Sequence, residues 1–491
     1  MRKEVVVIAS LSTTLAVVAA VGLINRWKKK KERQHRRTRN LVRKFARESA
    51  TPVKTLWLIA DDLVSNMKAS LSSSSSSSIE TTKLDIIISY ASSLPNGEEE
   101  GFFYGVDMRG TNFLILCARL KGKNSHVSDL DREEISFPLL FDATRQEVFE
   151  FVATEIVKFI LSHPHPEKEN SNAPMTLGFT LSNLVDQAGT TSNHWKTFAA
   201  DDPVGKEVVN DFNQALKNHG INNIQVFAMV EDTVGGLAGG RYYSRDNVAA
   251  VTLGMSTNAV YVEAAQDVPR WTHQNPASDE LVISTEWRNF KSSHLPLTKF
   301  DESLDAESSN HGSEIFAKVV SGKYLGEIVR RVLLNLAQET ALFGDKVPPN
   351  LTIPYRLRAP DMGAMHQDTS EHHEVVMEKL RDVFGIKGAS EMAREVVAEV
   401  CDIVTERAAR IAAAGIVAII QKLERTQNRR SVVTVEGELY EHYRIFRNYL
   451  HSGVWEMLGN DLSNNVIIQT PHGGAGTGTL FLAAAQTHHS S

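Results

Sequence analysis

The sequence predicts an α/β protein of two lobes that follows a single N-terminal transmembrane helix. Three observations lead to this expectation. Residues 5–24 carry no charged side chain, strand-like apolar runs recur between residues 102 and 263, and helical periodicity dominates the second half. Strand-rich and helix-rich segments in one chain are typical of an α/β fold. A length of 491 residues, 42% of them apolar, is enough for two to four domains.

Charge is divided unequally along the chain. Residues 1–47 carry fourteen Lys or Arg and two Glu, a net charge of +12, so the remaining residues carry −18 within the total of −6. An acidic body does not favour nucleic acid as a partner, and a solubilising surface is the simpler interpretation. Cys117 and Cys401 are the two cysteines of the sequence, which excludes a disulfide framework and favours a reducing, intracellular setting.

The segment at residues 5–24 is long enough to cross a bilayer. At about 1.5 Å rise per residue it spans about 30 Å as a helix, the thickness of the hydrocarbon core. The Lys- and Arg-rich flank at residues 26–39 predicts that the bulk of the chain faces the cytosol. A cleaved secretory signal is the alternative, but its apolar core would be shorter, about 7–15 residues, and its charge would lie mainly on the N-terminal side.

The elements that follow are expected in a definite order. Residues 40–70 have a helical pattern, and the serine run at residues 72–78 indicates a linker. The apolar runs 102–107 and 113–119 predict a β-hairpin, and residues 143–162 predict a helix. Further strands are expected at residues 175–181, 224–230, 248–253, 259–263, 431–435 and 465–469, further helices at 314–344 and 388–424, and a glycine-rich turn at 473–478 before an apolar helix.

Five short motifs carry the candidate chemistry. They are DMRGTN at residues 107–112, VEDTVG at 230–235, LGMSTN at 253–258, EW at 286–287 followed by SSHLPL at 292–297, and VEGELYEHY at 435–443. A tight turn with exposed N–H groups can hold a phosphate, and an aspartate beside it can hold the water shell of Mg²⁺. For the first motif a purely structural hairpin turn is the alternative.

In this order the five motifs resemble the hexokinase family, specifically the membrane-anchored plant hexokinases, over residues 35–488. The resemblance is closest to the plant hexokinase-like proteins with degenerate active sites. It implies the actin-like ATPase fold, with a small and a large lobe around a cleft for sugar and ATP. It also implies transfer of the γ-phosphoryl group of Mg·ATP to the 6-hydroxyl of a hexose such as glucose, fructose or mannose, in which positioning and charge neutralisation dominate.

The resemblance also implies how the chain is divided. The expected parts are a transmembrane anchor at residues 1–25, a basic cytosolic neck at 26–47, the small lobe at 48–240 and the large lobe at 241–491, whose C-terminal helix returns to the small lobe. Hydropathy does not identify the membrane. We expect a single-pass protein of the outer mitochondrial membrane, with the plastid envelope or endoplasmic reticulum as alternatives.

Individual residues receive roles from the same resemblance. Asp232 is implied as the general base that takes the hydroxyl proton, and Asp107 is implied to hold Mg²⁺ through water. The implied sugar contacts are Ser182, Glu231, Asp232, Asn258, Glu286 and Glu314. The implied nucleotide contacts are Asp107, Arg109, Gly110, Thr111, Asn112, Thr257, Glu436 and Gly437.

Several of these positions depart from the family pattern. Glu231 stands where the family has an asparagine, and a carboxylate accepts hydrogen bonds but cannot donate them as an amide does. Arg109 replaces a glycine of the first phosphate turn, Met255 a threonine of the second, and Ala317 a sugar-binding glutamate. Other departures lie at Leu114, residues 181–184, residues 195–198, Glu314, Glu436 and residues 473–476.

The departures predict a hexokinase-like protein with weak or lost activity and a sugar-binding or regulatory role. Four or five losses of about 1 kcal/mol each would lower transition-state stabilisation by a factor of about a thousand or more. An active hexokinase of glycolysis with altered kinetics is the alternative, because Asp232, Asp107, Asn258 and Glu286 are all present. A membrane-anchored protein without a ligand is the third possibility.

Overall fold

The computed structural model describes most of the chain. The described residues are 25–26, 28–72, 84–89, 94–109, 112–137, 144–163, 175–181, 203–271, 279–426, 429–473 and 476–487. The predicted transmembrane segment at residues 5–24 and most of the serine run at 72–78 lie outside them. Within these ranges, no helix combines the length and apolar character needed to cross a membrane.

The described chain forms two compact units. One contains the described residues up to Ala50 together with Pro296–Glu302 and Gly326–Val404, and the other contains Thr51–Leu295, Ser303–Leu325 and the described residues from Thr405 onward. Both sheets and all described residues with an expected ligand role belong to the second unit. The lobe boundary expected at residue 240 falls within this unit and stays a prediction.

A five-stranded mixed sheet in the second unit has the strand order β4-β3-β2-β5-β6. Its strands are β2 (Glu100–Arg109), β3 (Asn112–Lys121), β4 (Ser128–Ser136), β5 (Met175–Leu181) and β6 (Ile224–Glu231). β2 and β3 form the predicted hairpin, with Arg109 opposite Asn112. β5 and β6 run parallel to β2, so the carboxyl ends of these three strands lie at one edge of the sheet.

Helices α3 (Arg145–Ser162) and α4 (Pro203–Asn218) supply apolar side chains to the core of this sheet. The ring of Phe212 packs edge-on against Phe149 of α3 and Phe179 of β5, with centroids 5.1 Å and 4.9 Å away. α3 begins with a capping box between Thr144 and Glu147, which satisfies two backbone N–H groups at its start. The predicted helix at residues 143–162 is thereby confirmed.

A six-stranded sheet in the same unit has the order β1-β9-β8-β7-β10-β11. Its strands are β1 (Ile87–Ile88), β7 (Asn247–Leu253), β8 (Thr257–Ala264), β9 (Glu280–Ser284), β10 (Ser431–Glu436) and β11 (Val466–Gln469). β7 runs parallel to β10 and antiparallel to β8. Every residue of β7 is buried, which is typical of a strand covered on both faces.

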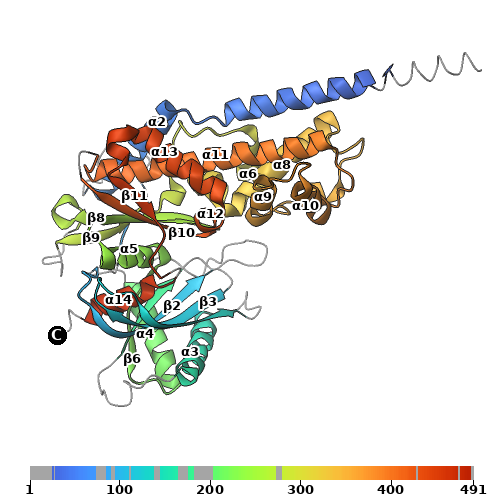
Figure 1. Cartoon of the computed structure of the whole chain (residues 1–491). Coiled ribbons are helices and arrows are strands. Elements are labelled where there is room, and N and C mark those ends of the chain that lie inside the picture. The colour runs from blue at the N-terminus through green and yellow to red at the C-terminus, as the bar shows by residue number, and fades with distance from the viewer. Residues whose placement is uncertain are drawn as a thin grey trace, which may run out of the picture. The chain divides into compact units, whose positions relative to one another are not determined.

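Helices α5 (Asp232–Tyr243) and α14 (Gly478–Thr487) pack against each other (Figure 1). α5 also packs on β7, and α14 packs on β2 and β5, so the two helices contact strands of both sheets. Their approach requires glycine, because a Cβ on Gly478 would lie 2.1 Å from the carbonyl oxygen of Gly235. Backbone contact with α14 therefore fixes the N-terminal turn of α5, which begins at Asp232.

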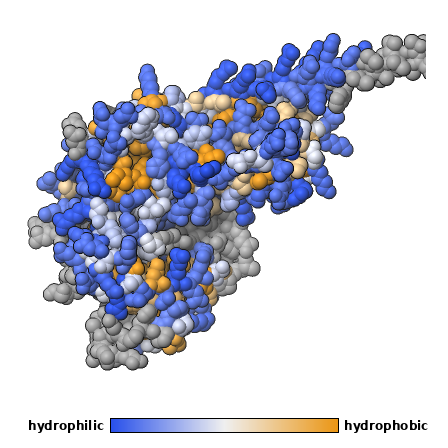
Figure 2. Space-filling view, viewed as in Figure 1, coloured by the Kyte–Doolittle hydropathy of each residue, from blue (hydrophilic) through white to orange (hydrophobic). Residues whose placement is uncertain are grey.

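The remaining helices include the long, largely buried α11. They are α2 (Val53–Leu71), α6 (Lys299–Glu307), α7 (Ile315–Val320), α8 (Gly322–Thr340), α9 (Ala359–His366), α10 (Glu374–Phe384), α11 (Glu391–Lys422), α12 (Glu438–Glu441) and α13 (Arg444–Ser463), with short 3₁₀ turns η2 (Ala265–Asp267), η3 (Trp287–Asn289) and η4 (Pro349–Thr352). On the face drawn in Figure 2 hydrophilic side chains predominate, including those over the mostly exposed helix at residues 28–48.

Two predicted helices are interrupted. The segment at residues 40–70 is divided between the helix at 28–48 and α2, because Pro52 takes an extended conformation with φ −61° and ψ 151°. The segment at 314–344 is divided between α7 and α8 at Ser321, which is extended with φ −82° and ψ 149°. The strand predictions at 175–181, 224–230, 248–253, 259–263, 431–435 and 465–469 are confirmed to within two residues at each end.

Candidate functional site

Asp232 is the first residue of α5 and follows β6 directly. Its Oδ1 accepts a hydrogen bond of 2.8 Å from the backbone N–H of Thr233 and one of 3.3 Å from the Thr233 hydroxyl. The same hydroxyl is 2.8 Å from that of Thr252 on β7. A carboxylate in the first turn of a helix is also stabilised by the helix dipole. The expected general base is therefore held by α5 and, through Thr233, by the second sheet.

Asn258 lies at the centre of a polar cluster that contains several expected sugar contacts. Its Nδ2 donates to Glu231 Oε1 at 2.6 Å, to Ser284 Oγ at 2.8 Å and to Glu286 Oε1 at 3.2 Å. The Ser284 hydroxyl is 2.9 Å from Glu231 Oε2 and 3.2 Å from Glu286 Oε1. Because an amide nitrogen has two hydrogens and a hydroxyl has one, these donors are shared among more acceptors than they can serve at once.

Each member of this cluster comes from a strand end or from a turn just beyond one. Glu231 ends β6, Asn258 is the second residue of β8, and Ser284 ends β9. Glu286, 2% exposed, has φ 49° and ψ 36°, the left-handed region that a residue with a Cβ seldom adopts. Such strain persists where surrounding contacts hold it, and it is common at functional sites.

Burial and charge both perturb the acids of this cluster. Burial, followed by the neighbouring Asp232, raises the pKa of Glu231 above its ordinary value, although Asn258 and Ser284 act in the opposite direction. Burial and then Glu231 raise the pKa of Glu286 to about 7, against the lowering effect of Arg288. Near neutral pH the cluster therefore carries less negative charge than its number of carboxyl groups would suggest.

Arg288 adds a cation that the sequence motifs did not identify as functional. It lies in the 3₁₀ turn η3, and its guanidinium is 2.6 Å from Glu286 Oε2. Burial lowers the pKa of Arg288, but Glu286, Glu231 and Glu314 together raise it above the ordinary value, so the guanidinium stays charged. Ser284 was missed as well, because the strand β9 that it ends was not predicted; its position two residues before Glu286 was the one available signal.

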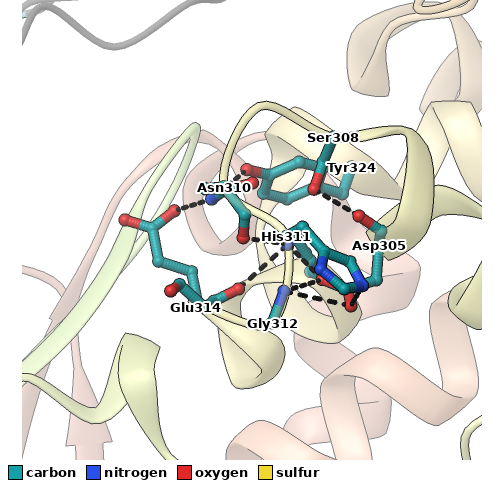
Figure 3. A network of polar contacts seen from close by, with 9 residues as sticks. Asp305, Ser308, Asn310, His311, Gly312, Glu314 and Tyr324 are labelled. Carbon is teal, nitrogen blue, oxygen red and sulfur yellow. Dashed lines mark hydrogen bonds and ion pairs between the residues drawn. The ribbon is translucent and has the colours of Figure 1, made fainter.

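Glu314 is carried by a loop that precedes α7 (Figure 3). Its Oε2 accepts a hydrogen bond of 2.7 Å from Asn310 Nδ2, which also lies 3.3 Å from the Tyr324 hydroxyl. Buried Lys318 closes the loop by donating to the carbonyl oxygens of Asn310 and Ser313, each at 2.9 Å. Figure 3 shows the Glu314 carboxylate on the Asn310 side of the loop, away from the Asp305 carboxylate.

Asp305 anchors the other side of the same loop. It is paired with Lys318, and its Oδ1 accepts a hydrogen bond of 3.0 Å from the backbone N–H of Gly312. Burial acts to raise the pKa of Asp305, but the bonds from Lys318 and Gly312 lower it overall. Ala317, where the family pattern has a glutamate, is buried in α7 and offers no polar group to a ligand.

Asp107, the expected Mg²⁺ residue, is buried in β2. Its Oδ1 accepts a hydrogen bond of 2.7 Å from the Thr180 hydroxyl on β5. Leu114 is its cross-strand partner on β3 and belongs to the apolar core. Among the described residues no group of three or more His, Cys, Asp or Glu is arranged around a possible metal ion, and a role for Asp107 through water stays a prediction.

The first phosphate turn is only partly described. Gly110 and Thr111 lie outside the described residues, as do Ser182 and residues 195–198. The backbone of Arg109 ends β2, and the side chain of Asn112 on β3 hydrogen-bonds Glu134 on β4. The expected roles of these residues stay predictions.

The carboxyl ends of β7 and β10 approach each other at the expected nucleotide side. Gly437 follows β10 with φ 103°, and a Cβ there would lie 2.5 Å from the carbonyl oxygen of Leu253 at the end of β7. A Cβ on Gly236 of α5 would come within 3.0 Å of Glu436 Oε1. In open α/β sheets ligands bind beyond the carboxyl ends of such strands. The nucleotide role expected for Glu436 and Gly437 stays a prediction.

The second expected phosphate turn, which contains Met255, connects β7 to β8. Its Gly254 carbonyl accepts a hydrogen bond of 2.8 Å from the N–H of Gly322 at the start of α8, while Met255 is 40% exposed. Thr257 is buried, and its hydroxyl accepts a hydrogen bond of 3.0 Å from the indole N–H of Trp287. The Thr257 hydroxyl therefore orients Trp287, the neighbour of Glu286 in the sequence. The motif at residues 253–258 did not indicate this contact.

Comparisons with known proteins bear on this arrangement. Two family models described as hexokinase match residues 41–242 and 248–485. Hexokinase-2 of Oryza sativa subsp. japonica is 43% identical to this chain over 96% of each protein. Hexokinase-1 of Spinacia oleracea is 41% identical over 100% of this chain and 99% of its own.

A solved structure extends the likeness to three dimensions. The hexokinase from Schistosoma mansoni complexed with glucose has 26% sequence identity and a TM-score of 0.75, covering 91% of this chain and 99% of its own. These matches confirm the expected actin-like ATPase fold with two lobes.

Proposed function

The chain belongs to the hexokinase family, and we propose that it binds a hexose while transferring phosphate from ATP weakly or not at all. The family reaction phosphorylates a hexose such as glucose or fructose at the 6-hydroxyl, with Mg²⁺ and ATP. In this chain the same site would serve a sugar-binding, regulatory role. The proposal fits a family scaffold whose local chemistry has changed around the base.

The pair formed by Glu231 and Asp232 is the observation that carries this proposal. Two carboxyl groups at consecutive positions stand where the reaction needs one base and an approaching polyanionic phosphate. Glu231 cannot donate the hydrogen bonds of an amide, and its oxygens accept from Asn258 and Ser284 instead. Glu231 disfavours the reaction in either state: ionised, its charge repels the γ-phosphoryl group, and its raised pKa shows that a second charge beside Asp232 is itself unfavourable.

Hexose binding is supported by the residues that remain around the base. Asn258 and Glu286 lie within hydrogen-bonding distance of each other, and Asp232 follows Glu231 directly. Amide and carboxylate groups held in this way can donate to and accept from sugar hydroxyls. ATP and Mg²⁺ are proposed as ligands beside Asp107, Glu436 and Gly437, where the described backbone and carboxylates suit a nucleotide and its hydrated cation.

An active hexokinase with altered kinetics is the second candidate. It is favoured by the presence of Asp232 at the start of α5 and by the relatives, which are named hexokinases and extend over almost the whole chain. The two candidates agree on hexose binding and differ on turnover.

Thermal unfolding with and without ligands tests the shared part of the proposal. Glucose, mannose, fructose and Mg·ATP are each added to the full chain, and a ligand at about 100 times its Kd stabilises the folded state by about 2.7 kcal/mol. We expect an increase in Tm with at least one hexose. No shift with any of the four ligands would contradict both candidates.

We also propose that residues 5–24 anchor the chain in the outer mitochondrial membrane with its bulk in the cytosol. The proposal is supported by the length and apolar character of this segment and by the basic residues that follow it. A chain lacking residues 1–25 should move from the membrane to the soluble fraction, whereas the full chain should resist carbonate extraction. Extraction of the full chain by carbonate would exclude the anchor.

A further inference from the structure

Arg288 places a guanidinium beside the carboxylate of Glu286. The two groups are 2.6 Å apart, and the side chain of Arg288 is 25% exposed whereas that of Glu286 is 3% exposed. Arg288 also experiences the charges of Glu231 and Glu314. One cation therefore contacts one of the carboxyl groups expected to bind sugar and interacts electrostatically with two others.

Both oxygens of Glu286 already have donors in this arrangement. Oε1 lies 3.2 Å from Asn258 Nδ2 and 3.2 Å from Ser284 Oγ, and Oε2 lies 2.6 Å from the Arg288 guanidinium. The contact with Arg288 joins two charged groups and is the shortest of the three. Both partners of this bond can be ionised, whereas a sugar hydroxyl that donates to the same oxygen is a neutral donor and brings no charge of its own.

We propose that Arg288 sets the affinity for hexose by holding the Glu286 carboxylate in an internal ion pair. A hexose hydroxyl must displace the guanidinium from Oε2 or accept a carboxylate whose charge is already neutralised. This inference rests on the proposed hexose-binding function and identifies the residue that weakens it. Arg288 is thus an affinity-determining residue, and removing it should strengthen hexose binding.

The geometry allows the displacement that the proposal requires. Arg288 belongs to a 3₁₀ turn of three residues, and part of its side chain is in contact with solvent. Glu286 is nearly fully buried and is held by Asn258 and Ser284. The arginine can therefore leave the pair for water, while the carboxylate stays in place for a ligand.

Glucose titration of the full chain by calorimetry tests the proposal, at a pH well above the pKa of Glu286 in wild type and variants so that its carboxylate stays ionised without Arg288. We expect Arg288→Ala to lower the Kd for glucose by about tenfold or more, which is the effect of one hydrogen bond to a charged group. Arg288→Lys keeps a cation at this position, so its Kd for glucose should stay close to that of the wild type. The matched control is Lys291→Ala, which removes the same charge from an exposed position three residues away and should leave the Kd unchanged.

A double variant separates the proposed role from a general loss of charge. If Arg288 acts through Glu286, the gain from Arg288→Ala should disappear when Glu286→Gln is also present, because the two effects are coupled. Should Arg288→Ala fail to fold, Arg288→Gln removes the charge at nearly constant length and gives the same readout.

The outcomes distinguish this inference from the function on which it rests. If the wild type binds glucose and Arg288→Ala binds it equally or more weakly, the inference is overturned and hexose binding stands. If the wild type, Arg288→Ala and Arg288→Gln all fail to bind glucose, mannose or fructose, the proposed function fails together with the inference.

Discussion

Glu231, Asp232 and Glu286 have different surroundings although all three are carboxylic acids near one another. Asp232 is held by Thr233 at a helix start, Glu231 by Asn258 and Ser284, and Glu286 by a strained backbone. A base needs a position, a matched pKa and compatible neighbours. Asp232 has the position of a base, but its neighbour Glu231 is a second carboxylic acid and is not compatible with that role. If phosphotransfer is weak, as proposed, we therefore expect the cause to lie in these residues and not in the fold.

Glu286 predicts a dependence of stability on pH. Its pKa is raised from the ordinary value of 4.5 to about 7 by burial and by Glu231, so the folded state binds a proton more tightly than the unfolded state. The resulting stabilisation is fully present below about pH 4.5 and is lost as pH rises through 7. Relative to wild type, Glu286→Gln should gain on the order of 2 kcal/mol of unfolding free energy between pH 5 and pH 8, measured by urea denaturation.

Glu456, whose pKa is lowered in the folded state, provides the control for this experiment. The hydrogen bond from Arg410 lowers the pKa of Glu456, so its stabilisation is present above pH 4.5 and is lost only as pH falls further. Glu456→Gln should therefore differ from wild type by a constant amount between pH 5 and pH 8. A constant difference for Glu286→Gln as well would contradict the perturbed pKa of Glu286.

The resemblance to hexokinases predicted part of this constellation but not its internal pairing. Glu231, Asn258 and Glu286 were expected around one sugar, and the structure brings them together. Arg288 was not expected, because nothing in the sequence indicates that a residue in a short 3₁₀ turn will point its guanidinium at the carboxylate two positions earlier. Such local pairing depends on the left-handed backbone at Glu286, which only the structure reveals.

At the scale of elements, the contact between α5 and α14 positions the base. A Cβ at Gly478 would overlap the backbone of Gly235, one turn from Asp232. Gly478→Ala should therefore force the two helices apart and destabilise the protein by about 1–3 kcal/mol, as overpacking does. Urea denaturation measures this loss, and weaker hexose binding should accompany it.

A glycine of α5 at the same helix pair serves as the control. In Gly239→Ala the new Cβ would lie 3.4 Å from the ring of Phe481, an ordinary van der Waals distance. Alanine also favours a helix by up to about 1 kcal/mol over glycine. If Gly478→Ala were as stable as Gly239→Ala, the close approach of α5 and α14 would not be a real constraint.

Elements were predictable where apolar patterning was strong. β7 and β10 are buried along almost their full lengths, and their apolar runs were identified to within two residues. β4, with the sequence SDLDREEIS, was missed because an edge strand needs little apolar surface and carries charged residues. β1 is two residues long and takes its conformation from pairing with β9, which no local pattern indicates.

At the scale of the molecule, the order of five motifs identified the fold before any geometry was known. The matches to hexokinases across residues 41–242 and 248–485 confirm that fold. The anchor at residues 5–24 and the phosphate turn at 110–111 lie outside the described residues and stay predictions. A fold tolerates changes in a few ligand contacts because its core is built elsewhere, so membership of a family does not decide turnover.

Turnover of the full chain in a coupled assay for hexose 6-phosphate tests the central claim most directly. We predict a kcat at least about a thousandfold below an ordinary enzyme rate of about 10 s⁻¹ with glucose, mannose or fructose. The combined changes Arg109→Gly, Glu231→Asn, Met255→Thr and Ala317→Glu should raise it substantially, with Lys291→Ala as the inert control. A wild-type kcat near 10 s⁻¹ would contradict the claim that this hexokinase-family protein has lost efficient phosphotransfer.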